Sequence, residues 1–134
     1  MTQHAFIKLM PKSTQQTITL AEIKDLFHYY KNITAKTGDQ VNWNYGEAAF
    51  PYVMNERTHN DHTLLELVSN EDRYNHFYVG VKEENDEHII FLSLPENATF
   101  GDKGKANEFC RFLAKKLQGQ LHLFNGRIMY FYKR

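Results

Sequence analysis

The stretch of sequence that decides the fold is TLAEIKDLFHYYKNITAKT, residues 19–37. Thr19 and Glu22 have the spacing of a capping box, in which each side chain bonds to a free backbone N–H at the start of a helix. The apolar residues that follow repeat at helical spacing: Leu20, Ile23, Leu26, Phe27, Tyr30 and Ile33. We therefore predict a helix over residues 20–37, ended by Gly38 in a left-handed conformation.

A second helix with one apolar stripe is predicted later in the chain. It opens at Gly101-Asp102, where we expect the Asp102 side chain to be the N-cap, and it ends at Gly119. Its stripe consists of Ala106, Phe109, Cys110, Leu113 and Leu117. Helices with a single apolar stripe must cover another element, and one side of an antiparallel sheet fits that need.

The strands of this sheet are predicted from short apolar runs and from alternation. Residues 5–10 and 88–94 form two of them, and a third runs from Tyr74 with Phe77, Val79 and Val81 on one face. A polar turn at residues 83–86 separates the last two. Residues 50–54 are predicted to form a short edge strand, because Pro51 cannot donate a ladder hydrogen bond. Residues 64–69 fit either a strand or a helical turn.

The chain ends in a predicted hairpin around Asn125-Gly126, the sequence that a two-residue type I′ turn requires. Such a turn places Leu123 opposite Ile128 and Leu121 opposite Tyr130. The face that we expect to be core is then Leu121, Leu123, Ile128, Tyr130 and Tyr132. The other, mixed face is His122, Phe124, Arg127, Met129 and Phe131.

These elements predict one α+β domain over residues 1–134, a two-layer sandwich. Its sheet is mostly antiparallel, with two helices packed on one face, in the order β-α-β(3-4)-α-β-β. No internal repeat, low-complexity tract or linker divides the sequence.

Charge and cysteine content exclude several classes of protein. The 16 basic and 16 acidic residues leave no net charge, which disfavours a duplex-DNA binder. The charges are segregated: residues 56–102 carry eleven acidic and three basic side chains, and residues 103–134 carry one acidic and eight basic. We expect these two segments to be neighbours that neutralise each other. One cysteine, no signal peptide and no membrane-length apolar run indicate a cytoplasmic protein that has no contact with membranes.

Catalytic and metal-binding motifs are weak. His59-Asn60-Asp61-His62 provides two histidines in a pattern that needs three or four metal ligands, so we predict a solvated loop and no metal site. Cys110 lies on an apolar stripe and is expected to be a buried core residue. Neither a nucleophile elbow nor a Gly-rich phosphate loop is present, and we predict no cofactor. The sequence therefore favours a protein without enzymatic activity.

Two segments are candidates for binding. The first is WNYGEAAFPY, residues 43–52, whose aromatic side chains Trp43, Tyr45 and Tyr52 either plug the edge of a core or line a groove. The second is the mixed hairpin face with His122, Phe124, Arg127 and Phe131, beside basic residues of the second helix. Aromatic and basic side chains on a sheet suit single-stranded nucleic acid, but we favour the alternative that the first helix or a partner subunit covers Phe124 and Phe131.

Three stretches of the sequence resemble a small family of uncharacterised proteins from Bacillus-type bacteria, catalogued as a domain of unknown function. They are residues 15–20, residues 26–31 with the sequence LFHYYK, and residues 43–52. The resemblance implies a cytoplasmic bacterial protein of α+β fold. It implies no catalytic residues.

The function predicted first is a non-enzymatic binding or protein-interaction module, whose partner is another protein or a second copy in a homodimer. The alternatives are a single-stranded nucleic-acid binder, with nucleic acid disfavoured by the balanced charge, and a small-molecule enzyme. The enzyme would use His59, Asp61, His62 or other histidines that only folding brings together.

Overall fold

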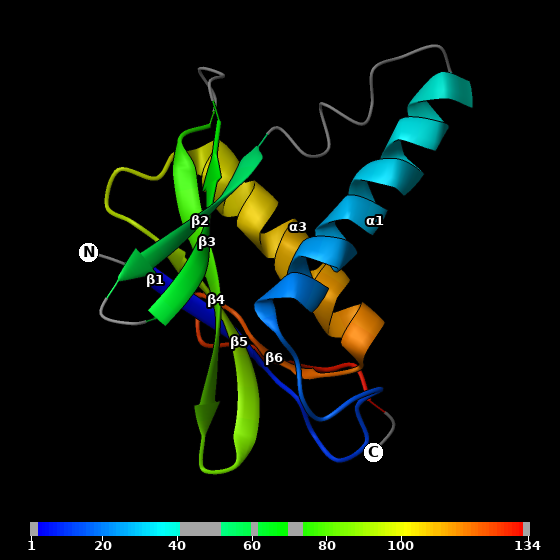
Figure 1. Ribbon diagram of the computed structural model, residues 1–134, viewed down its shortest axis with the longest axis vertical. Helices are drawn as coiled ribbons and strands as arrows, with labels where there is room; N and C mark the ends of the chain where they lie inside the picture. Colours follow the sequence, from blue (N-terminus) through cyan, green and yellow to red (C-terminus); the bar gives the residue numbers. More distant parts are fainter. Residues whose placement is uncertain (1–2, 41–51, 60–61, 70–73, 133–134) are drawn as a thin grey trace.

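The computed structural model describes residues 3–40, 52–59, 62–69 and 74–132, and within these ranges it contains two helices and seven strands. The elements follow the order β1 (Gln3–Lys8), α1 (Leu20–Gln40), β2 (Val53–His59), β3 (His62–Val68), β4 (His76–Glu84), β5 (Glu87–Leu94), α3 (Phe100–Leu117), β6 (Gln120–His122) and β7 (Ile128–Tyr130). Figure 1 shows α1 beside α3 and a strongly twisted sheet. The predicted α+β class is confirmed.

The strands form one antiparallel sheet in the order β2-β3-β4-β5-β1-β6-β7. The open question over residues 64–69 is thus resolved as strand β3. The predicted short edge strand is at the edge of the sheet, but β2 begins at Val53, and Pro51 lies outside the described residues. β4 and β5 meet at the two-residue turn Asn85-Asp86, where both φ angles are positive, 53° and 65°, as a type I′ turn requires.

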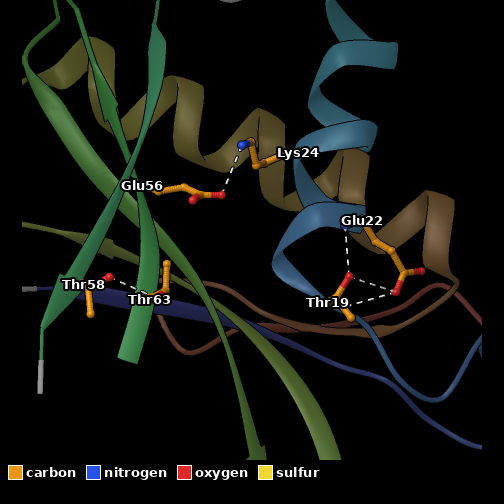
Figure 2. A network of polar contacts seen from close by, with 6 residues as sticks. All are labelled: Thr19, Glu22, Lys24, Glu56, Thr58 and Thr63. Carbon is orange, nitrogen blue, oxygen red and sulfur yellow. Dashed lines mark hydrogen bonds and ion pairs between the residues drawn. The ribbon is translucent and has the colours of Figure 1, made fainter. Parts of the chain in front are cut away.

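Helix α1 begins at the predicted place (Figure 2). The Thr19 N–H donates to Glu22 Oε1 at 3.1 Å and the Glu22 N–H donates to Thr19 Oγ1 at 3.2 Å, which completes the capping box. The expected end at Gly38 is wrong, because the helix continues through this glycine to Gln40. One turn after the cap, Lys24 forms a 3.1 Å ion pair with Glu56 of β2 and so links the helix to the edge strand.

Helix α1 packs on α3 through aromatic side chains. The Phe27 ring meets the Phe109 ring edge-on with centroids 5.4 Å apart, and the Tyr30 ring meets Phe112 at 5.0 Å. The Lys116 ammonium lies 4.3 Å from the Tyr29 ring. Phe27 and Phe109 belong to the same buried cluster as alternate residues of the strands, including Ile7, Leu67 and Leu92. Both helices therefore contribute to one core on one face of the sheet.

Helix α3 begins one turn earlier than the predicted N-cap. Thr99 is the N-cap, and Asp102 is the third helical residue, whose side chain completes a capping box. The two residue types at this spacing fit either assignment from sequence alone. The last residue of the helix is Leu117, two before the predicted end at Gly119, and the C-cap Gln118 adopts a left-handed conformation. All five residues of the predicted apolar stripe are buried.

The C-terminal hairpin forms, but its register differs by one residue from the prediction. Leu121 pairs with Met129 and His122 with Ile128. The Leu123 N–H donates to the Arg127 carbonyl at 2.8 Å, and Gly126 has φ 87°, so the loop has three residues, with the glycine in the left-handed position of a bulge.

A shift of one residue exchanges the two faces of a strand. Met129 and Phe131 consequently pack against the core, whereas Ile128 and Tyr130, which we expected in the core, are exposed. Leu121 and Leu123 are buried as predicted.

Glycine 119 is required where α3 runs into β6. A Cβ atom there would lie 2.7 Å from Ile7 Cγ2 and 3.0 Å from the Lys8 carbonyl oxygen of β1. We expect Gly119→Ala to lower the free energy of unfolding by about 1–3 kcal/mol, the usual effect of overpacking. Urea denaturation measures the change.

Gly104, in the interior of α3, is the matched control, because a Cβ atom there meets nothing within 4 Å. Gly104→Ala should raise the free energy of unfolding by roughly 0.5–1 kcal/mol through helix propensity. Equal stability of Gly119→Ala and the unsubstituted chain would contradict the close approach of α3 to β1.

Candidate functional site

Of the three aromatic residues predicted in the segment 43–52, only Tyr52 lies in the described part of the chain; Trp43 and Tyr45 lie outside it. The Tyr52 side chain is buried, and its ring meets Tyr74 and Phe77 edge-on at 5.6 and 5.1 Å. Its hydroxyl donates to Asp102 Oδ1 at 2.6 Å. Of the two roles predicted for this segment, Tyr52 has the first: its side chain plugs the edge of the core.

Asp102 is a fully buried carboxylate at the start of α3. Besides the Tyr52 hydroxyl it accepts the Asn75 N–H at 3.1 Å on both oxygens and the Thr99 N–H at 3.0 Å. Burial, and then the hydrogen bond to Asp102 and its charge, raise the pKa of Tyr52 far above its ordinary value, so the phenol stays neutral. These donors already engage both carboxylate oxygens, and the group serves structure.

Cys110 is not an activated nucleophile. Burial raises the pKa of its thiol to about 12, so the thiol stays protonated near neutral pH, and a protonated thiol is a poor nucleophile. The prediction that Cys110 is a core residue is confirmed.

The predicted histidine cluster is only partly described. His59 and His62 are paired in register at the ends of β2 and β3, His62 is exposed, and Asp61 lies outside the described residues. No group of three or more potential metal ligands occurs among the residues that the structure describes. His4 bonds to Ser93 and His88 to the Ile18 N–H, so these histidines have structural partners in different places.

The four hairpin residues predicted as a site are divided between three places. Phe131 packs against the core. Phe124 and Arg127 line a groove beside α3, together with Arg111 of that helix. His122 lies on the opposite face of the sheet, stacked on Phe6 at 4.3 Å between ring centroids. The mixed face does not exist as predicted, because the register shift moved Met129 and Phe131 away from His122.

The far face of the sheet, opposite the core, carries a row of residues of which sequence reasoning singled out only His122 as a candidate for binding. The row crosses five strands at one register level: Gly80, Phe91, Phe6, His122 and Ile128. A Cβ atom at Gly80 would lie 2.3 Å from Phe91 Cζ, so the glycine lets the Phe91 ring lie over β4. We call this row, together with the neighbouring Tyr130 of β7, the aromatic face.

A hollow of about 510 Å³ lies at the β2 side of the aromatic face, lined by Leu64, Tyr78, Phe91 and polar residues. Burial, followed by the charge of Glu66 and a hydrogen bond to it, raises the pKa of Tyr78. Glu66 also forms a 2.9 Å ion pair with Arg57. The signal for this face was in the sequence, since aromatic residues occupy the positions between buried ones, as Phe6 does between Ala5 and Ile7.

The acidic segment 56–102 and the basic segment 103–134 are neighbours in part, since α3 contacts β4 and β5. Within the described residues no ion pair joins a basic side chain of residues 103–134 to an acidic one of residues 56–102. Lys105, for example, pairs within its own helix with Glu108 at 3.0 Å. The neutralisation that we expected between the two segments is therefore not seen as direct contacts.

Comparisons with known proteins give a family but no activity. A family model described as "Domain of unknown function (DUF1885)" matches residues 3–133. A solved structure titled "Crystal Structure of Protein of Unknown Function from Bacillus stearothermophilus" is 42% identical, with a TM-score of 0.61, over 88% of this chain and 92% of that chain. No curated protein matches. None of the helices in the described residues is long and apolar enough to cross a membrane.

The bond between Tyr52 and Asp102 can be tested by stability. We expect Tyr52→Phe to lower the free energy of unfolding by about 1.5–3 kcal/mol, the usual range for a hydrogen bond to a charged group. Tyr74→Phe, on the ring that packs against Tyr52, is the control and should change it by less. In a double-mutant cycle with Asp102→Asn, a coupling energy near zero would show that the hydroxyl and the carboxylate do not depend on each other.

The environment of His122 predicts a pH effect. Burial, and then the charge of Lys8, lower the pKa of His122. Because the pKa in the folded state lies below that of the unfolded state, this residue's contribution to stability is complete above about pH 6.5 and falls as the pH drops through the folded pKa. Proton NMR of the ring should show the pKa rising in Lys8→Gln, and thermal melts of His122→Gln should depend less on acid pH. An unchanged ring pKa in Lys8→Gln would contradict the effect of Lys8.

Proposed function

We propose that this chain, which belongs to the DUF1885 family of domains of unknown function, is a non-enzymatic binding module that recognises another protein in the bacterial cytoplasm. The observation that carries the proposal is the aromatic face. Its half-buried rings, Phe91, Phe6 and His122, are partners in register on three neighbouring strands. By contrast, two buried titratable groups of the described chain have structural roles: Asp102 accepts hydrogen bonds in the interior, and the Cys110 thiol is buried and protonated.

Exposed apolar side chains lie at the β7 end of the aromatic face. Ile128 and Tyr130 on β7 are 42% and 41% exposed. Protein interfaces typically have such a core of Tyr, Phe and aliphatic side chains inside a polar rim. The hydrophobic gain on covering the face would favour association.

The charges around the aromatic face support a protein partner over a nucleic acid. Arg57 is paired with Glu66, and Lys82 with Glu84 at 3.4 Å. Lys8 is a cation on this face without such a pair in the described residues, and it lies 5.9 Å from the Phe6 ring. Nucleic acid binding needs several unpaired cations along the path of the phosphates, and this face has few.

A bacterial cytoplasm suits the single buried cysteine, which needs no oxidising compartment. We also propose that Trp43 and Tyr45 take part in the contact, since segments dense in such residues are common at interfaces. Tyr52 is excluded from this role by its burial. The partner is another protein or, in the alternative arrangement, a second copy of the chain.

The test removes the apolar edge of the aromatic face. The variant Ile128→Glu plus Tyr130→Glu is compared with Tyr29→Glu plus Ile33→Glu on α1, whose side chains are equally exposed at 43% and 38%. A partner captured by the full chain is purified, and its Kd is measured for both variants. We expect roughly tenfold or greater weakening for the β7 variant only, as for residues at the centre of an interface.

Three further results decide the proposal. Equal weakening by both variants, with circular dichroism showing intact folds, would refute the aromatic face as the contact. A Kd that weakens steeply with salt would replace the protein partner by a nucleic acid. Unchanged affinity in Trp43→Ala plus Tyr45→Ala would remove those two residues from the contact, and sedimentation of the chain alone identifies the homodimer.

A further inference from the structure

A second surface, independent of the aromatic face, is the groove between α3 and the loop that joins β6 to β7. Its volume is about 360 Å³, within the range of small-molecule sites. The helix contributes Gly104, Asn107, Glu108 and Arg111, which share one side of α3 because they are three or four residues apart. At Gly104 the helix has no side chain, and a Cβ atom there would meet nothing within 4 Å, so this end of the groove stays open.

The opposite wall is the three-residue hairpin loop. It contributes Leu123, Phe124, Asn125 and Arg127. The Arg127 N–H donates to Asn125 Oδ1 at 3.0 Å, and the Leu123 N–H donates to the Arg127 carbonyl, so Arg127 is anchored at the backbone while its side chain is exposed. Phe124 packs partly against the core and is half-buried. The loop thus offers a supported ring beside a guanidinium group.

The groove is electropositive. In the part of the chain that the structure describes, neither Arg111 nor Arg127 forms an ion pair with a carboxylate. Glu108, the acidic residue of the lining, is held by Lys105 at 3.0 Å. In the described stretch 103–132, six side chains are basic and one is acidic. An anion that enters the groove therefore meets two uncompensated guanidinium groups.

The groove combines two guanidinium groups, two amides and an aromatic ring, and these groups restrict the kind of ligand that it can bind. Guanidinium forks match the oxygens of phosphate and carboxylate groups, and the half-buried face of Phe124 suits a flat ring. Asn107 and Asn125 add neutral donors and acceptors. We propose that this groove binds a phosphate monoester attached to a flat ring, of the size of a mononucleotide, with Arg111 and Arg127 on the phosphate and Phe124 against the ring.

The experiment is calorimetric titration of the full chain at low salt with AMP, phenyl phosphate, adenosine and inorganic phosphate. AMP and phenyl phosphate should bind, and adenosine and inorganic phosphate should bind at least about tenfold more weakly. Arg111→Gln and Arg127→Gln should each weaken AMP binding by about tenfold or more, because each removes a charge-assisted contact. Phe124→Leu should weaken AMP and leave inorganic phosphate unchanged.

Two more variants separate the groove from general charge and from folding. Lys115→Gln removes one positive charge from an exposed position of α3 that does not line the groove, and it should change AMP binding by less than about twofold. Gly104→Leu places a side chain at the open end of the groove, where a Cβ atom meets nothing within 4 Å, and improves helix propensity, so it should abolish AMP binding in a folded protein.

Several results would overturn the proposal. No binding of AMP or phenyl phosphate at millimolar concentration would do so, and so would equal weakening by Lys115→Gln and Arg111→Gln. Equal affinity for inorganic phosphate and AMP would show that the ring contributes nothing. Binding of a tetraglutamate peptide that depends on both arginines, without AMP binding, would replace the small molecule by an acidic protein segment. Each result is independent of the aromatic face.

Discussion

The structure depends on one buried charge, the carboxylate of Asp102. A carboxylate in a protein interior is tolerated only when hydrogen bonds replace its water, and Asp102 receives them from three directions. The Thr99 N–H is local to the helix start, the Asn75 N–H comes from the segment before β4, and the Tyr52 hydroxyl comes from the residue before β2. The positive end of α3 also favours the charge. One side chain therefore ties the start of α3 to the segments that precede β2 and β4.

The two faces of the sheet differ in how far their apolar side chains are buried. On one face Phe27, Phe109 and alternate strand residues fill a shared core, and no buried side-chain nitrogen or oxygen among the described residues is left without a partner. On the other face the rings of Phe6, His122 and Phe91 stand in a row that the described helices do not cover. The Phe91 ring lies where a side chain of residue 80 would be, and only glycine leaves that space free. Apolar side chains are buried in the core on one face of the sheet, and on the other face they are not covered by the described helices.

The charges follow a similar division. Among the described residues no ion pair joins the acidic turn between β4 and β5 to α3, and Lys105, Lys82 and Arg57 each pair with a carboxylate nearby. A chain with no net charge thus has a groove lined by Arg111 and Arg127, whose one acidic lining residue, Glu108, is paired with Lys105. Net charge describes solubility and general affinity, whereas the local field around a groove depends on which charges folding brings together.

The sequence by itself determined the elements. Periodicity and the capping box of Thr19 predicted α1, the apolar stripe predicted α3, and alternation predicted β4 and β5, because these signals are local. Tertiary structure decided the rest. Asn125-Gly126 fits a two-residue and a three-residue loop, and packing of Met129 and Phe131 against the core selected the latter. That single-residue difference determined which side chains of β7 face outward. Two loop conformations that the local sequence allows almost equally are thus distinguished by how the strand packs against the core.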